Sequence, residues 1–546
     1  MPKIVLEHVT KRWGHYYGVD DLNLVIDDNS FITLLGPSGC GKTTTLRMIA
    51  GLETPTSGRI TIGDRVVFDS DAGINVPASK RKVGFLFQNY ALWPNMTVYQ
   101  NISFGLKNIK EDLPIVDETI LTLRQINKIM ARANEIVKIA KETSRKKGKG
   151  EVDRAELRVI DKFEVSQYTA KKILDYNLQD AEDLEEAVKT IVANNEETIA
   201  LHIGKHHAKG YEVDEEGRLI APDGNPIVKN RKLTKEEIDI AVRKSSRKVR
   251  IGEFMARYPN ELSGGQQQRV AIARTLAPAP TVLFMDEPLS NLDAKLRLEM
   301  RSELQRLHIT TGSTFVYVTH DQLEAMTLAT KICLINNGVL QQYEPPLDIY
   351  HHPTNLFVAD FVGNPSINMI EAKGKQKADG SVELTILDDK KVTFVPNEKV
   401  SIEQFHKDEV VRLEQEAAFE AEKKANGYVE KNNKDLPFKY HISKVEESET
   451  LEEYVPTEED FVLAIRPEYI NFEKGVCEGV VYSAMPAGME TTVKVRIGEY
   501  LLTCVIFGGV SYQIDKTVDL SFTGDDILLY DRKSTRLIAQ GKIVVK

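Results

Sequence analysis

The stretch Gly36-Pro37-Ser38-Gly39-Cys40-Gly41-Lys42-Thr43 has the spacing GxxxxGK[ST], which could bind phosphate. Glycines let backbone N–H groups approach an anion without a clash from a Cβ atom. Lys42 can bridge the β- and γ-phosphates of a nucleotide, and the Thr43 hydroxyl can bind Mg²⁺. A glycine turn beside a helix cap has a similar composition. The spacing favours the phosphate loop.

A second candidate for phosphate chemistry is the acidic pair Asp286-Glu287, directly after the apolar run Thr281 to Met285. Asp286 can hold the coordination shell of Mg²⁺, and Glu287 can act as a general base toward an attacking water. An acidic pair at a strand end can also be purely structural. The functional interpretation depends on its lying on the same sheet as the phosphate loop.

The elements that must position these residues are visible as apolar runs and helical periodicity. Ile32 to Leu35 predicts a buried strand that leads into the glycine loop, and Lys42 to Ala50 predicts the helix after it. The other signals are two strands, Thr314 to Val318 and Ile332 to Ile335, and one helix, marked by Leu296, Met300, Leu304 and Leu307 and closed by Gly312. This order predicts an α/β fold with a parallel sheet covered on both faces.

Further motifs carry a family resemblance. Leu262-Ser263-Gly264-Gly265-Gln266 resembles the signature of the ATP-binding-cassette (ABC) ATPases, which have a P-loop, RecA-like fold with a helical subdomain. Gln88 in FLFQNYALWPNMTV resembles the Q-loop glutamine, and Ser290-Asn291-Leu292-Asp293 the D-loop. His320 in YVTHD resembles the switch histidine, and Trp13 lies where the family stacks an aromatic ring on adenine.

The resemblance implies a role for each motif. Ser263 and Gly265 would touch the γ-phosphate bound by a second chain, so the unit would be a head-to-tail homodimer that sandwiches two ATP molecules. Glu287 and His320 would govern hydrolysis, and Gln88 would link the γ-phosphate and Mg²⁺ to the partner. The residues expected to contact ATP are Trp13, Gly36, Ser38, Gly39, Cys40, Gly41, Lys42, Thr43, Thr44, Asp286, Ser263, Gly264, Gly265, Gln266 and Asp293, and those expected to hold Mg²⁺ are Thr43, Gln88 and Asp286.

Beyond the cassette, the chain resembles the maltose-type, multiple-sugar importer ATPases of bacteria. The motifs are LSNLDAKLR (289–297), DQLEAMTL (321–328), DFVGNPSINMI (360–370) and AIRPE (464–468). This resemblance implies a C-terminal OB-like β-barrel regulatory domain, two transmembrane permease subunits and an extracellular solute-binding protein. The chain would lie at the cytoplasmic face of the membrane. Relatives that import polyamines or glycerol-3-phosphate share most motifs, so other solutes remain open.

The chain departs from that family between Gln88 and Leu262, where it is far longer. We expect the cassette in residues 1–108 and 234–364, a charged insertion in the helical subdomain at 109–233, and the regulatory domain at 365–546 with an internal insertion near 400–459. The insertion at 109–233 can be a tolerated surface segment or a docking module, and a cytoplasmic regulator could bind there or at the C-terminal domain. His202, His206 and His207 have a metal-like spacing, but we expect Gly204 to interrupt their helix and therefore expect no metal.

Composition limits the alternatives. The net charge of −10 disfavours a general nucleic-acid binder. No run approaches the apolar length of a membrane span, no secretory signal opens the sequence, and four cysteines without a CxxC pair suit a reducing cytoplasm. A non-transport ABC protein remains an alternative, although one GxxxxGK[ST] and no sustained heptads disfavour the translation and chromosome types. An exporter ATPase would fit the cassette but not a C-terminal barrel.

Overall fold

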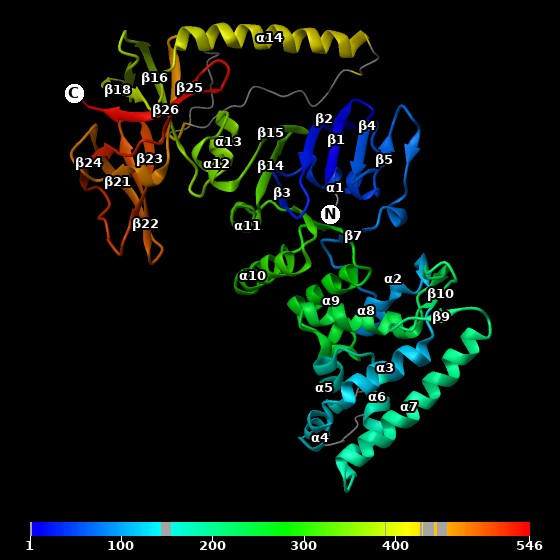
Figure 1. Ribbon diagram of the computed structural model, residues 1–546. Coiled ribbons are helices and arrows are strands. Elements are labelled where there is room, and N and C mark those ends of the chain that lie inside the picture. Colours follow the sequence, from blue (N-terminus) through cyan, green and yellow to red (C-terminus); the bar gives the residue numbers. More distant parts are fainter. Residues whose placement is uncertain are drawn as a thin grey trace. The chain divides into compact units, whose positions relative to one another are not determined.

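The structure is a computed structural model that describes residues 3–142, 154–387, 389–425, 429, 442–444 and 456–545 (Figure 1). The chain forms two compact units, residues 1–81 with 314–546, and residues 82–313. Of the expected insertion near 400–459, the structure describes residues 400–425, 429, 442–444 and 456–459, and the remaining residues lie outside the described part. No helix in the described part of the chain is long and apolar enough to cross a membrane.

The first unit begins with an antiparallel sheet in the order β2-β1-β4-β5-β6. Its strands are β1 Ile4–Trp13, β2 Tyr16–Ile26, β4 Ser57–Ile62, β5 Arg65–Asp69 and β6 Ile74–Asn75. Beside it, β3 (Phe31–Leu35) pairs in parallel with both β13 (Thr314–Val318) and β14 (Lys331–Asn336). All residues of β3 and β13 are buried, as their continuous apolar sequences predict.

Four helices and one more strand complete the described cassette part of this unit. Helix α1 (Lys42–Ala50) starts where the glycine loop ends, as predicted, and Gly51 ends it in the left-handed conformation. The other elements are β15 Val339–Glu344, which pairs antiparallel with β14, and the helices α11 Gln322–Leu328, α12 Pro346–His351 and α13 Leu356–Phe361.

The C-terminal part of the first unit contains a closed, antiparallel six-stranded barrel, which confirms the predicted OB-like domain. The barrel strands are β16 Asn368–Gln376, β17 Val382–Ile386, β18 Lys390–Pro396, β26 Leu537–Val544, β25 Ile527–Asp531 and β19 Asp460–Ile465. A second sheet follows the order β20-β24-β21-β22-β23, formed by Ile470–Asn471, Thr517–Phe522, Cys477–Pro486, Glu490–Ile497 and Tyr500–Phe507. The helix α14 (Ile402–Ala425) follows β18.

A buried arginine fastens the barrel to the helices before it. The Arg466 guanidinium is 2% exposed and donates hydrogen bonds to the carbonyls of Tyr350, Ala359 and Val362. It also stacks on the Tyr350 ring, whose hydroxyl donates to Glu468 at 2.7 Å. Because a buried cation needs acceptors on every side, these contacts tie the end of α13 to the start of the barrel.

The second unit holds two parallel strands and the helices that follow them. Strand β7 (Val83–Leu86) pairs with β12 (Val282–Asp286). The helices are α2 Val98–Leu106, α8 Lys235–Lys248, α9 Gly264–Leu276 and α10 Ala294–Thr311. Helix α10 ends at Gly312 with φ 61°, as predicted.

The expected insertion forms a layer of helices with its own apolar core, centred on Ile120, Ile126, Val159 and Ile173. Its elements are β8 Lys110–Pro114, α3 Glu118–Met130, α4 Ala133–Glu142, α5 Arg154–Phe163, α6 Gln167–Asp175, α7 Leu184–His207, β9 Glu212–Val213, β10 Leu219–Ile220 and β11 Val228–Lys232. Strand β11 pairs antiparallel with β8, from Lys110 opposite Lys232 to Pro114 opposite Val228. The segment therefore leaves and re-enters the unit at one place.

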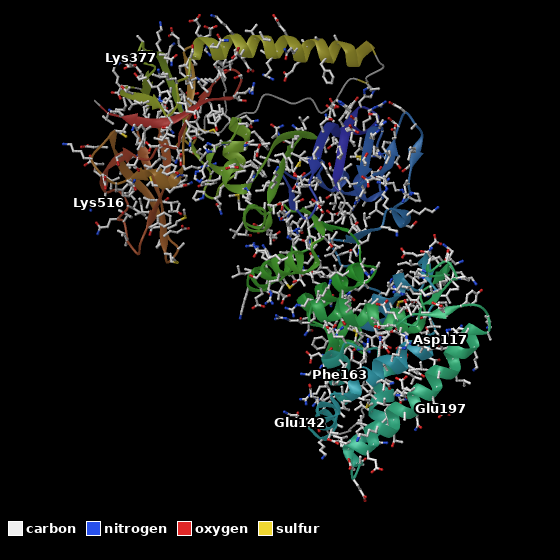
Figure 2. The ribbon with its side chains drawn as sticks, viewed as in Figure 1. Asp117, Glu142, Phe163, Glu197, Lys377 and Lys516 are labelled. Atoms are coloured by element: carbon white, nitrogen blue, oxygen red, sulfur yellow. The ribbon has the colours of Figure 1, made fainter. Side chains whose placement is uncertain are left out.

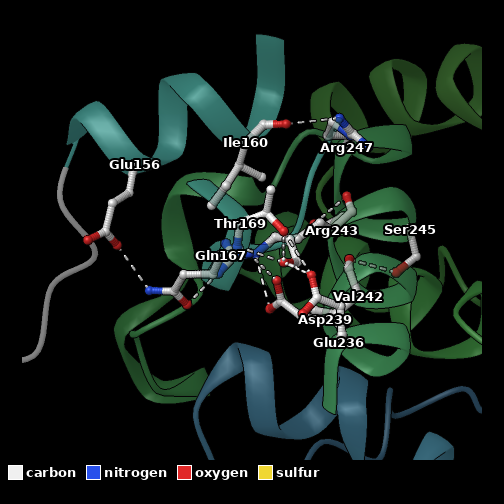
Figure 3. A network of polar contacts seen from close by, with 12 residues as sticks. Glu156, Ile160, Gln167, Thr169, Glu236, Asp239, Val242, Arg243, Ser245 and Arg247 are labelled. Carbon is white, nitrogen blue, oxygen red and sulfur yellow. Dashed lines mark hydrogen bonds and ion pairs between the residues drawn. The ribbon is translucent and has the colours of Figure 1, made fainter. Parts of the chain in front are cut away.

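A buried polar network joins this insertion to helix α8 (Figure 3). The Gln167 amide N–H donates to Asp239 at 2.6 Å, and the Gln167 side chain accepts from Arg243 at 3.1 Å. Arg247 donates to the carbonyl of Ile160 at 3.3 Å. The network fixes the register between α5, α6 and α8 because each of these groups is directional.

Candidate nucleotide site

The glycine loop lies at the carboxyl end of β3, where the helix N-terminus of α1 faces it. Lys42 is 6% exposed, and its ammonium donates to the carbonyls of Gly36 and Pro37 at 2.8 and 2.7 Å. The N-cap of α1 is Gly41, which offers no side-chain cap, so the first amides of the helix are available to an anion. Ser38 and Gly39 are exposed, and Thr43 and Thr44 are half-buried.

Close packing explains two of the glycines in the loop. A Cβ atom on Gly41, which has φ 104°, would lie 2.1 Å from the carbonyl oxygen of Gly18. A Cβ on Gly36 would lie 2.1 Å from the carbonyl oxygen of Ile335. Burial raises the pKa of the Cys40 thiol, despite the opposing charge of Lys42, so this cysteine is a neutral part of the loop.

The hairpin of β1 and β2 carries Trp13 to the loop. The Trp13 ring is 49% exposed and packs on Gly18, where a Cβ atom would lie 2.7 Å from the ring. Gly18 in turn contacts Gly41 through its carbonyl oxygen, as described above. The ammonium of Lys11 lies 5.2 Å from the centre of the Trp13 ring. An exposed aromatic face is therefore present next to the phosphate loop.

His320 leaves the sheet at the same edge as the glycine loop. Val318 of β13 lies opposite Leu34 of β3. His320 comes two residues after Val318, and Gly36 comes two residues after Leu34, so both follow the same edge of the sheet. His320 is exposed. Behind it, Glu324 accepts hydrogen bonds from the hydroxyls of Tyr317 and Thr319 at 2.7 and 2.8 Å, which fixes the turn that presents the histidine.

In the second unit, the acidic pair and Gln88 lie together at the carboxyl ends of paired strands. Met285 of β12 is the register partner of Leu86 of β7. Gln88 donates from Nε2 to Oε2 of Glu287 at 3.1 Å. Glu287 has φ 46°, a left-handed conformation that is rare outside glycine and is often found at functional sites. Asp286 is 5% exposed at the strand end.

The signature and D-loop motifs are the starts of two packed helices. Ser263 is the N-cap of α9 and forms a capping box with Gln266, and Asp293 is the N-cap of α10. A Cβ atom on Gly265 would lie 2.8 Å from the Leu296 side chain, so glycine permits this contact between the helices. Ser263 and Gly264 are exposed, which leaves the start of α9 open to a ligand.

Sequence reasoning missed the residues that hold the Q-loop. Asn291 donates from its side chain to the Gln88 carbonyl at 3.0 Å. Arg274 of α9 donates to the carbonyls of Tyr90 and Ala91, both at 2.6 Å, and both of those residues have positive φ. Nothing in the sequence marks Arg274, whereas Asn291 is part of the D-loop motif and was assigned no separate role.

The histidines of the insertion correct one expectation. Gly204 does not interrupt the helix, because α7 runs unbroken from Leu184 to His207. His202 and His206 therefore lie one turn apart on one face, and their ring nitrogens lie 3.0 and 2.8 Å from Oδ2 of Asp117. Asp117 caps α3 and is labelled in Figure 2. Three such residues could suggest a cation, yet no group with metal-binding geometry occurs in the described ranges.

Comparison with known proteins agrees with these motifs. A family model described as ABC transporter matches residues 19–290. The trehalose/maltose import ATP-binding protein of Thermococcus litoralis is 35% identical over 372 residues, which cover 68% of this chain and 67% of that protein. The maltose/maltodextrin import ATP-binding protein of Escherichia coli is 31% identical over 71% of this chain and 70% of its own length. The sn-glycerol-3-phosphate import ATP-binding protein of Brucella abortus is 33% identical over 68% and 70%.

The fold and the matched sequence define a P-loop ATPase with an appended barrel. The chain belongs to the ABC transporter family, as one of its ATP-binding, ATP-hydrolysing proteins.

Proposed function

We propose that this chain is the ATP-hydrolysing subunit of a membrane importer, and that the imported solute is a sugar of the di- or oligosaccharide class. The observation that carries the proposal is the similarity, over two thirds of the chain, to import ATP-binding proteins whose names specify trehalose, maltose or maltodextrin. Relatives named for glycerol-3-phosphate and for spermidine and putrescine match at 33% and 35% identity, so those solutes are the main alternatives.

We propose that the nucleotide is held by the groups that the family resemblance implies. One set is the loop amides, Lys42 and the exposed face of Trp13. On binding, Lys42 exchanges the carbonyls of Gly36 and Pro37 for phosphate oxygens. The other set is Asp286, Gln88 and Glu287. The hydroxyl of Thr43, the carboxylate of Asp286 and the amide oxygen of Gln88 are the hard oxygen donors that Mg²⁺ prefers. Bound Mg²⁺ would neutralise charge on the β- and γ-phosphates.

Hydrolysis is assigned to Glu287 with help from Gln88 and His320. The Glu287 carboxylate accepts from Gln88, which orients it, and as general base it takes a proton from the attacking water. His320 is exposed at the edge from which the glycine loop departs, and from there it can donate to the γ-phosphate. Each group is a side chain at the carboxyl end of a strand, the usual place for ligands in parallel sheets.

We propose that a second copy of the chain completes the ATP site. Ser263 and Gly264 are exposed at the start of α9, where a helix N-terminus favours an anion. We propose that they meet the γ-phosphate of ATP bound by the partner copy, in a head-to-tail homodimer. Hydrolysis would then remove contacts that hold the dimer closed.

The remaining partners follow from the importer role. They are two transmembrane permease subunits and an extracellular solute-binding protein, and the chain would be attached to the cytoplasmic face through the permeases. The insertion at 109–233 belongs to the unit that carries the signature helix, so it is the candidate docking or regulatory module.

Affinity purification tests the proposal. The Glu287→Gln chain is tagged and extracted from its native cell with mild detergent and ATP, and the co-purified proteins are identified. The expected companions are two polytopic permeases and a sugar-binding protein. The Lys42→Ala chain, treated identically, is the control for contacts that need bound nucleotide.

Other co-purified proteins would change the proposal in different ways. A binding protein for glycerol-3-phosphate or a polyamine would replace the sugar and keep the importer. Several permease pairs would indicate a shared ATPase. Ribosomal or DNA-associated proteins without any permease would overturn the transport role and leave the ATPase chemistry intact.

A further inference from the structure

A cavity of about 360 Å³ lies in the second unit, and none of the residues that line it is among those assigned to ATP above. Its walls are formed by the C-terminal end of α8, the middle of α9 and the C-terminal part of α10. The volume is within the range of pockets that hold small organic ligands.

The rim of this cavity is strongly cationic. The charged residues that line it are Arg247, Lys248, Arg250, Arg269 and Arg306, against the single carboxylate of Glu303. Arg269 and Glu303 satisfy each other through two hydrogen bonds of 2.9 and 2.7 Å. In the described ranges Lys248, Arg250 and Arg306 form no ion pair. Burial, and then the like charge of Lys244, lower the pKa of Lys248, which is the effect expected of a cation that lacks a counter-ion.

The floor of the cavity is apolar. Ile272 of α9 and Met300, Leu304 and Leu307 of α10 line it, and each is less than 9% exposed. Val249, which directly follows α8, contributes the remaining apolar wall. A ligand that only carried charge would gain nothing from packing against this apolar floor, and a purely apolar ligand would leave the cations uncompensated.

We propose that this cavity binds a small organic anion, a phosphate ester or carboxylate with a compact apolar body. The anionic group lies between Lys248, Arg250 and Arg306, and the apolar body lies on Met300 and Leu304. Arg269 is already paired with Glu303, so its charge is compensated, and its side chain only forms part of the wall of the cavity. This site is additional to the ATPase proposal and does not depend on it.

The position of the site connects three functional segments. Helix α9 begins at the signature serine Ser263, and α10 begins at Asp293 of the D-loop. Helix α8 is bound to the insertion through Arg247 and Ile160 (Figure 3). A ligand that contacts all three helices therefore stabilises one arrangement of them, which is the physical basis of an effector site.

The first experiment measures binding by calorimetry on the full chain at low salt. Phenyl phosphate and phenylacetate are the probes, and excess ADP with Mg²⁺ occupies the phosphate loop throughout. Inorganic phosphate tests charge alone, and benzyl alcohol tests the apolar body alone. We expect at least one aryl anion to bind at or below the millimolar range and at least fivefold more tightly than both fragments. The tighter of the two anions identifies phosphate or carboxylate as the natural group.

Charge-removing variants locate the binding. The double variant Lys248→Gln, Arg306→Gln should weaken the aryl anion at least tenfold, because two charge-assisted contacts are lost. The matched control is Lys189→Gln, Lys205→Gln on helix α7, which removes the same charge from exposed helical positions far from the cavity lining. It should bind as the wild type does.

A second measurement reports binding at the apolar floor of the cavity without using these charge-removing variants. Methyl-labelled methionine gives a signal for Met300, assigned through Met300→Leu, and a bound phenyl ring should shift it whereas inorganic phosphate should not. The proposal is overturned if the Met300 signal stays in place at saturating probe, if inorganic phosphate binds as tightly as the aryl anions, or if both double variants bind equally.

Discussion

At the residue scale, the proposal makes Glu287 the general base for hydrolysis, and a substitution tests this role. We expect Glu287→Gln to lower turnover by about 10²- to 10⁴-fold, the usual contribution of a general base. An amide can still pair with Gln88 at the 3.1 Å separation seen here, so ATP affinity should change less than threefold. Steady-state phosphate release and nucleotide titration are the measurements.

The control for this variant is Glu299→Gln, an exposed carboxylate on α10. It should keep wild-type turnover. A Glu287→Gln chain that hydrolysed ATP at the wild-type rate would move the general base elsewhere.

The chain has two tryptophans, and they allow a matched test of adenine stacking. Trp13→Ala should weaken ATP binding by about 1–3 kcal/mol, by analogy with base–aromatic stacking, and should affect turnover at saturating ATP much less. Trp93 is similarly exposed but packs against Phe104 in the second unit. Trp93→Ala should therefore leave ATP affinity unchanged, and equal losses in the two variants would contradict the assignment of Trp13.

At the scale of elements, Asp117 joins α3 to α7. Burial raises the pKa of Asp117, but hydrogen bonds from His202 and His206 and from the Ile120 amide lower it to about 2. Because this pKa lies below the ordinary value near 3.9, the stabilisation is present above about pH 4 and is lost as the pH falls toward 2. Figure 2 shows Asp117 beside the long helix α7.

The prediction concerns Asp117→Asn, which keeps a helix cap but removes the charge. At pH 7 it should lower the free energy of unfolding by about 1.5–3 kcal/mol, the usual contribution of a hydrogen bond to a charged group. The difference from wild type in calorimetric melting temperature should shrink as the pH falls from about 4 toward 2. Asp183→Asn, at the exposed cap of α7 without histidine contacts, should show a smaller effect. A difference that grew on acidification would refute this linkage.

Elements with a strong local signal were predictable, and those fixed by distant contacts were not. The strand, glycine loop and helix around Lys42 follow from local pattern, and so does the end of α10 at Gly312. The continuity of α7 through Gly204 does not, since a helix-interior glycine costs about 1 kcal/mol and contacts with Asp117 on another helix help to offset it. The positive φ of Glu287 and the anchoring of the Q-loop by Arg274 likewise depend on tertiary contacts.

At the scale of the whole molecule, deleting the insertion at 109–233 tests whether it serves transport and not ATP hydrolysis. We expect its deletion to preserve basal ATPase and to abolish solute uptake. Lys110 and Lys232 are register partners, so a short glycine turn can replace everything between them. Asp239 and Arg243 of α8 would become exposed, and charged groups tolerate water. The measurements are phosphate release by the purified chain and uptake of the co-purified system's solute in cells.

Unchanged uptake after deletion would show that the insertion is a tolerated surface segment. Loss of both activities would show that α8 needs the insertion to keep its position. The thermal unfolding of the deletion variant, compared with that of the full chain, separates a displaced α8 from misfolding of the second unit, which contains the whole deleted range.

The closure of the barrel also sets an order for biosynthesis. Strand β18 pairs on one side with β26, where Phe394 lies opposite Ile543. Because Ile543 lies near the end of the barrel sequence, this pairing cannot form until almost the whole barrel has been synthesised. Until β26 has been synthesised, β18 has an unpaired edge, and such edges recruit other chains. The cassette strands β3, β13 and β14 are all made earlier. A nascent chain therefore carries an open sheet edge until β26 has been synthesised, and its need for a chaperone is greatest while that edge is unpaired.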